Sequence, residues 1–272
     1  MSGPSAVLRG TGPALAAPIV YRLAARLEQV PVQELLEDPA TAAFVLRSAQ
    51  DLFGLPLVVN HFQLGLEVEA PGAPLARDGL GLPAPGQAVD APLSAGTADR
   101  ELRAAAVDVV ARLSSELRGS AQVLGVLTGP ATLAALLGGS LDGVPELYAV
   151  MARRYAEAGA AGVLLAERPG SDEAVAAGTL AELANICRYY SVGSILLAPS
   201  AAAPAGPVDL ALGTSDVLPA ELLRRLPQDD AGRWSGRHGL LLTSGEVPAD
   251  ADPGTVTAWI DLLGNAPRGV RR

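Results

Sequence analysis

The sequence predicts an α/β protein built on parallel strands. Short apolar runs of strand length alternate with longer stretches of helical spacing, which is the pattern of repeated β-α units. The short runs are bounded by Gly, Pro or polar residues, and several of the longer stretches open at Asp-Pro or Leu-Pro pairs that suit a first helical turn. At 272 residues, 49% of them hydrophobic, the chain is long enough to bury a full core.

Each element is predicted from these signals in chain order. Strands are expected at Leu57 to Asn60, Gln122 to Thr128, Gly162 to Ala166, Ser194 to Ala198, Val208 to Leu212 and Gly239 to Thr243. Helices are expected at Pro39 to Asp51, Asp99 to Leu117, Pro145 to Ala158, Asp172 to Tyr190, Pro219 to Leu226 and Pro253 to Leu263. The Pro- and Gly-rich segment from Ala70 to Thr97 predicts a long loop rather than a linker, so residues 1–272 are expected to form a single domain. Residues 1–12 and 265–272 are expected to fray.

Composition excludes several classes of function. The 20 basic residues are all Arg, and without Lys there is no Schiff-base chemistry. A net charge of −9 with a pI near 4.8 argues against nucleic-acid partners, which need basic surfaces. The single cysteine, Cys187, makes no intramolecular disulfide, and no secretory signal opens the chain, so a cytoplasmic location is expected. The uncharged stretch from Gly119 to Leu141 is interrupted by Thr128-Gly129-Pro130, which argues against a membrane span.

Several segments, taken together, resemble one superfamily. They are the run Pro18 to Arg26, the helix end Ala49 to Gly54, the strand Leu57 to Asn60, the Glu-rich turn Gly65 to Gly72, the segment Gly125 to Leu133, the stretch Tyr155 to Glu167 and the closing segment Thr243 to Pro253. In this order they resemble the uroporphyrinogen decarboxylase superfamily, which also contains corrinoid-dependent methyltransferases.

The resemblance implies a distorted (β/α)₈ TIM barrel, with its site at the carboxyl ends of the strands. The chain is short for this superfamily. Between Val208 and Gly239 the pattern provides one strand fewer than a complete barrel requires, so one β-α unit is expected to be degenerate or missing. Because an opened barrel leaves apolar edges that need cover, and because the superfamily pairs its barrels, a homodimer is expected.

Candidate substrate-binding residues include two arginines near the start of the chain. Arg22 and Arg26 are four residues apart, so if that segment is helical, both guanidinium groups share one face and can hold carboxylates as bidentate forks. The resemblance implies this role, because an Arg pair of similar spacing holds substrate carboxylates in the decarboxylases. The alternative is a solvated helix face.

The strand ends supply the remaining candidates. His61 directly follows a predicted strand and is the candidate acid or base, although a structural histidine is the alternative. Glu167 and Glu246, at two other strand ends, complete the catalytic candidates. Asn60, Thr128 and Arg168 are candidate substrate ligands at the same edge.

No metal or cofactor is expected. The superfamily's methyltransferases resemble one another in a His-x-Cys pair with a distant Cys that binds zinc. This chain has no His-x-Cys pair, and Cys187 falls within a predicted helix. A site made of His61, Glu167 and Glu246 is the remaining, less favoured alternative.

The first functional expectation is a decarboxylase-like enzyme with cofactor-independent acid/base chemistry, which acts on a small anionic or carboxylated metabolite in specialised metabolism. Two alternatives stay open. One is a corrinoid-linked methyltransferase-like protein without a thiolate zinc site. The other is a non-catalytic barrel that binds a ligand or serves as a scaffold.

Overall fold

The computed structural model describes residues 15–69, 75–78, 82–84, 89, 93–99, 101–170, 176–199, 206–227, 234 and 239–263. The termini that were expected to fray lie outside these ranges. The strands are β1 (Leu15–Ile19), β2 (Leu57–Val59), β3 (Gln122–Thr128), β4 (Gly162–Ala166), β5 (Gly193–Leu197), β6 (Leu210–Leu212) and β7 (Leu240–Glu246).

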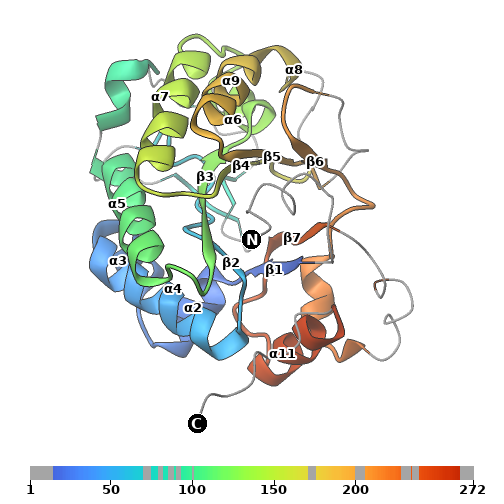
Figure 1. Ribbon diagram of the computed structural model, residues 1–272. Coiled ribbons are helices and arrows are strands. Elements are labelled where there is room, and N and C mark those ends of the chain that lie inside the picture. Colours follow the sequence, from blue (N-terminus) through green and yellow to red (C-terminus); the bar gives the residue numbers. More distant parts are fainter. Residues whose placement is uncertain are drawn as a thin grey trace.

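Helices cover the outside of these strands (Figure 1). The α-helices are α2 (Tyr21–Leu27), α3 (Val32–Glu37), α4 (Pro39–Phe53), α5 (Glu101–Glu116), α6 (Pro130–Leu136), α7 (Val144–Glu157), α8 (Ala176–Thr179), α9 (Ala181–Tyr190) and α11 (Pro253–Leu262). Two 3₁₀ helices, η1 (Ala95–Asp99) and η3 (Ala220–Arg224), accompany them.

All strand pairs within the two sheets are parallel, which confirms the predicted α/β class. A 5-stranded sheet has the order β2-β3-β4-β5-β6, and a 2-stranded sheet joins β1 to β7. Each strand of the larger sheet therefore pairs with the next strand along the chain, and helices fill most of the connections between them. This is the arrangement of repeated β-α units.

The two sheets are not joined into one closed ladder within the described residues. Between β6 and β7, the described residues pair with β7 through an isolated parallel bridge between Leu218 and Thr243. There, the Leu218 amide donates to Leu242 at 2.9 Å, and the Ser244 amide donates to Leu218 at 2.8 Å. The sequence led us to expect a missing strand between Val208 and Gly239. In the described part of this region, the single residue Leu218 pairs with β7 in place of a strand.

Several elements differ from the sequence prediction. The helices α2, α3 and α6 were not among the predicted helices. The strand β1 was not predicted, because its sequence LAAPI is short and contains Pro18, and the register of its pairing with β7 shifts at that point. The predicted helix from Pro219 is the 3₁₀ helix η3. Leu180 separates α8 from α9 in the segment predicted as one helix ending at Tyr190.

The core lies between the strands and the helices. The helix α7 contributes Tyr148 and Tyr155, both fully buried. The Tyr155 hydroxyl donates to the Val126 carbonyl at 3.0 Å, and the Tyr148 hydroxyl donates to the Thr128 carbonyl. The Tyr155 ring occupies the space in which a side chain at Gly125 would lie. Glycine at this position therefore allows α7 to pack closely against β3.

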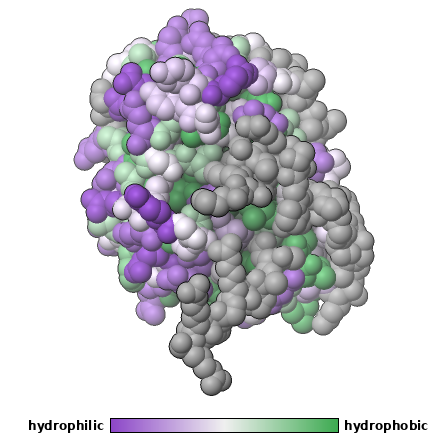
Figure 2. Space-filling view, in the orientation of Figure 1, coloured by the Kyte–Doolittle hydropathy of each residue, from purple (hydrophilic) through white to green (hydrophobic). Residues whose placement is uncertain are grey.

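The surface matches this layering. Hydrophilic residues gather over the outer helices in the view of Figure 2. Among the described residues, no helix has both the length and the apolar character that a membrane crossing would need.

Candidate active site

Three buried glutamates lie where the carboxyl ends of the strands meet the helices. Glu67 follows β2, Glu167 follows β4 and Glu246 ends β7. Each carboxyl group accepts a hydrogen bond from the backbone of a different segment of the chain. The glutamates therefore hold the edge of the fold together as well as placing acidic groups there.

Glu167 caps the first turn of α6. Its Oε1 accepts from the Ala131 amide at 2.9 Å, and its Oε2 accepts from the amide and the hydroxyl of Thr132 at 2.8 and 2.6 Å. A side chain at Gly129 would collide with this carboxyl group. Burial raises the pKa of Glu167, and the three donors oppose that rise because they stabilise the ionised form.

Glu246 performs a similar task at the start of α2. Its Oε1 accepts from the Arg22 amide, and its Oε2 lies 3.2 Å from the Arg22 Nε. The Glu246 side chain is only 6% exposed. Burial raises the pKa of Glu246 to about 8, although the charge of Arg22 acts against this rise. A carboxyl group with a pKa near 8 exchanges protons readily at neutral pH.

Glu67 is bound to the end of β3. It accepts from the amide of Thr128 at 2.8 Å and from the hydroxyl of the same residue. The Thr128 hydroxyl also accepts from the Gly65 amide at 2.6 Å. Thr128, a candidate substrate ligand, thus has its hydroxyl engaged within the protein.

A pocket of about 150 Å³ opens at this edge of the fold. Glu167 and Glu246 both line it, so the structure brings together two of the predicted catalytic residues. The other lining residues are Phe62, Leu82, Pro169, Pro219, Ala220, Glu221, Ser244 and Gly245. The lining is mainly apolar, with carboxyl groups as its charged members. This combination is typical of a small-molecule site, although typical ligand pockets are larger, at about 300–1,000 Å³.

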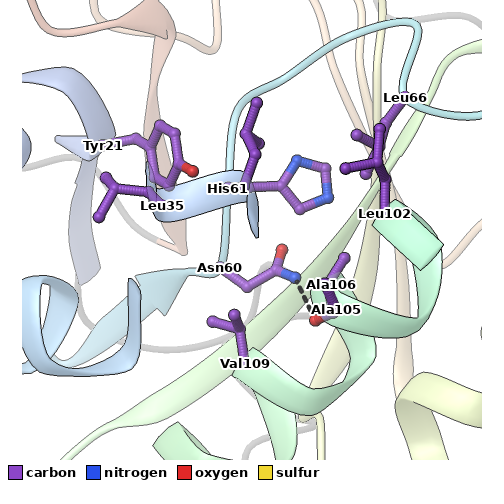
Figure 3. Close-up of a pocket in the computed structure, with 10 residues that line it drawn as sticks. Tyr21, Leu35, Asn60, His61, Leu66, Leu102, Ala105, Ala106 and Val109 are labelled. Carbon is purple, nitrogen blue, oxygen red and sulfur yellow. Dashed lines mark hydrogen bonds between the residues drawn. The ribbon is translucent and has the colours of Figure 1, made fainter. Parts of the chain in front are cut away.

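His61 lies apart from this pocket. It lines a small cavity of about 10 Å³ against α5, together with Asn60 and Tyr21 (Figure 3). The Gln63 amide donates to His61 Nδ1 at 3.2 Å, which places the proton of the neutral ring on Nε2. Within the described residues, Nε2 has no hydrogen-bond partner. Burial lowers the pKa of His61 to about 4, so the ring is neutral at pH 7.

Asn60 connects the end of β2 to its neighbours. Its Nδ2 donates to the Ala106 carbonyl in α5 at 3.0 Å, as Figure 3 shows, and its Oδ1 accepts from the Val126 amide in β3 at 3.0 Å. Both ends of the amide are therefore used by the fold. The substrate-binding role expected for Asn60 stays a prediction.

The candidate arginines are engaged with protein groups. Arg22 pairs with Glu246, and Arg26 donates to the Ala251 carbonyl at 2.9 Å. Arg168 donates to Asp78 at 3.0 Å. Both Arg22 and Arg26 lie on α2. A substrate carboxylate would have to compete with these contacts.

The described residues offer no group of three or more His, Cys, Asp and Glu side chains arranged for a metal ion. Cys187 is buried in α9, and burial raises the pKa of its thiol to about 12. A thiolate ligand is disfavoured there, because zinc binds the deprotonated form. The described residues therefore do not fit the thiolate zinc site of the methyltransferases that the sequence resembles.

Sequence reasoning missed two residues of this edge. Glu67 belongs to the Glu-rich turn that contributed to the family resemblance, and Phe62 directly follows His61. Phe62 could have been considered as a pocket residue together with His61, because successive side chains of an extended segment point to opposite sides. In the structure Phe62 lines the larger pocket and His61 the smaller one.

Comparison with known proteins gives a likeness in fold. No protein-family model matches the chain, and no curated protein matches it in sequence. Among solved structures, the chain is similar to a methyltransferase from Methanosarcina mazei, with a TM-score of 0.66 and 15% sequence identity. The match covers 95% of this chain and 96% of the other. At this identity the likeness shows that the two proteins share a fold.

Proposed function

We propose that this chain is a methyltransferase-like enzyme that acts on a small molecule in the pocket between Phe62, Glu167 and Glu246. The observation that carries the proposal is the fold shared along nearly the whole chain with a protein described as a methyltransferase. The pocket lies at the carboxyl ends of parallel strands, which is where α/β proteins of this kind bind their ligands. Membership of the uroporphyrinogen decarboxylase superfamily, a barrel-like arrangement of the strands and a homodimer are parts of the same proposal.

Glu246 is the proposed proton carrier. Methyl transfer to a protonated nucleophile requires that the nucleophile lose its proton, and the ionised form of Glu246 would accept it. Because burial raises the pKa of Glu246 to about 8, the fraction of the enzyme with an ionised base increases as the pH rises from 6 to 8. The rate should therefore rise with pH and level off above about 8.

A corrinoid, if it is the methyl donor, would have to present the methyl group from outside. The pocket of about 150 Å³ is far smaller than a tetrapyrrole-like macrocycle. The proposal therefore assigns to this chain the binding of the small methyl acceptor and the removal of its proton.

This proposal replaces the decarboxylase-like enzyme as the favoured function. A decarboxylase of a carboxylated metabolite needs free cationic side chains at the site, and Arg22, Arg26 and Arg168 are each bound to protein oxygens. These contacts argue against the carboxylate clamp.

The second candidate is a non-catalytic ligand-binding scaffold. It is favoured by one observation, namely that Glu67, Glu167 and Glu246 all accept backbone hydrogen bonds. Residues with such structural tasks can be retained in a protein that has no catalytic activity.

A methyl-transfer assay separates the two candidates. The purified protein is incubated with methylcobalamin and a panel of small thiols and amines, and the loss of methylcobalamin absorbance is followed. The enzyme proposal expects acceleration over the protein-free rate, and a decrease of about 10²-fold in Glu246→Gln. Glu157→Gln, which changes an exposed glutamate paired with Arg153, is the matched control. Absence of acceleration with every acceptor would favour the scaffold.

A further inference from the structure

The charged side chains that line the proposed active-site pocket are all acidic. They are Glu167, Glu221 and Glu246, and no arginine belongs to the lining within the described residues. A pocket of this kind attracts cations and repels anions, because the low-dielectric protein around it strengthens each charge interaction.

Glu167 is the glutamate with the least compensated charge. The residue is 1% exposed, and its carboxyl group accepts three hydrogen bonds, which is the pattern of an ionised carboxylate. No described cation forms an ion pair with it: the neighbouring guanidinium of Arg168 pairs with Asp78 at 3.0 Å. A buried charge without a counter-ion is costly, so a cation that enters the pocket would gain by compensating it.

Arginines near the pocket neutralise only part of its negative charge. Arg22 pairs with Glu246, and Arg224 pairs with both Glu221 and Asp250. The Glu246 carboxyl group accepts one amide and one Nε contact. Since a carboxylate offers about four lone-pair positions, Glu246 retains acceptor capacity toward the pocket.

The remaining walls suit the apolar part of an organic cation. Phe62, Leu82 and Pro219 line the pocket, and the first two are buried in the fold. The face of an aromatic ring attracts an ammonium group, and apolar side chains pack against its alkyl substituents. Carboxylate and aromatic groups thus occur together on the walls of one small cavity.

We infer that the pocket selects a small organic ammonium ion, an amine that carries a short alkyl group, over a carboxylate of similar size. This inference rests on the proposed function, since it names the class of molecule that the same pocket would take. It differs from the anionic metabolite expected from the sequence.

Three probes of similar size, each with an isopropyl group, test this directly on the unmodified protein. Isobutylammonium chloride, isobutanol and sodium isobutyrate are titrated at pH 8.5, above the pKa of about 8 of Glu246, and binding is followed by saturation-transfer NMR of the ligand methyl groups. The inference expects isobutylammonium to bind at least about tenfold more tightly than isobutyrate, with isobutanol between them. Isobutyrate binding as tightly as isobutylammonium, or no binding by any probe, would overturn it.

Two variants locate the effect. Glu246→Gln and Phe62→Leu should each weaken isobutylammonium binding about three- to tenfold and leave isobutanol binding nearly unchanged. Glu157→Gln, on the exposed surface of α7, should leave the binding of all three probes unchanged. If the pocket variants preserve the ammonium preference, the cation binds elsewhere and the inference is wrong. Circular dichroism of each variant checks that it is folded, and the comparison of probes on the unmodified protein decides the matter if a variant is not.

The proposed ammonium selectivity and the proposed methyltransferase activity can be refuted independently, because ligand binding is measured without turnover. Methyl transfer to a neutral or anionic acceptor without ammonium selectivity would overturn the ligand class alone. Ammonium selectivity without methyl transfer would overturn the enzyme proposal alone.

Discussion

The buried His61 predicts a specific loss of stability in acid. Burial lowers the pKa of its imidazole from 6.5 to about 4 in the folded state, whereas the unfolded chain keeps the ordinary value. Between these two values the unfolded state binds a proton that the folded state does not bind. The free energy of unfolding must therefore fall as the pH falls from about 6.5, and the loss is complete below about 4.

The magnitude follows from the two pKa values. Between pH 7.5 and pH 5, the linkage relation gives a loss of about 2 kcal/mol from His61 alone. Urea unfolding at several pH values in this range measures it, with the difference between the unmodified protein and His61→Gln isolating the contribution of this residue. The other of the 2 histidines, His238, lies outside the described residues, and His238→Gln is the matched control.

A difference in the free energy of unfolding between the unmodified protein and His61→Gln that stays constant between pH 7.5 and 5 would contradict this prediction. Such a result would mean that His61 has an ordinary pKa and is accessible to water. It would restore His61 as a candidate acid or base at the edge of the fold.

Further predictions concern the helix cap, the close contact of α7 and the metal content. Glu167→Ala leaves three donors of α6 without their acceptor and should lower the free energy of unfolding by about 2–4 kcal/mol. The control Glu157→Ala, on the surface, should lower it by less than about 1 kcal/mol. Urea titration at pH 7 compares the two variants, and equal effects would contradict the role of Glu167 as a helix cap. Gly125→Ala places a methyl group where the Tyr155 ring lies and should lower the free energy of unfolding by about 1–3 kcal/mol. An unfolding midpoint equal to that of the unmodified protein would contradict this close contact. Protein purified without added metal should contain no stoichiometric zinc, and about one zinc per chain by elemental analysis would contradict the reading of Cys187 as a buried thiol.

The sequence predicted most of the parallel strands because their signals are local. The runs Gln122 to Thr128 and Gly162 to Ala166 are mainly apolar, and both are strands with the predicted bounds. The strand β1 was missed because Pro18 and small residues weaken the strand signal. Its pairing with β7 is a long-range contact, which a local pattern does not reveal.

The positions of the site residues were more predictable than the directions of their side chains. His61, Glu167 and Glu246 were placed at strand ends, and all three lie there. Which of them share a pocket depends on the twist of each strand end and on the packing of neighbouring helices. These features bring Glu167 and Glu246 to one pocket and turn His61 toward α5.

The capping roles of the glutamates could not be read from the sequence. The partners of Glu167 are separated from it by 35 and 36 residues, and the partner of Glu246 by 224. Such pairs form only when the strand order brings distant segments together. Local capping motifs, such as Asp252 at the start of α11, have partners within three residues and are therefore visible in the sequence.

The place of the functional site is tested by a crystal structure of the protein soaked with isobutylammonium chloride. We expect electron density for the ligand between Phe62 and Glu246, with its ammonium group toward the carboxyl groups of Glu167 and Glu246. Density in the cavity beside His61, or only at the molecular surface, would contradict the assignment of the functional site to the pocket at the ends of β4 and β7.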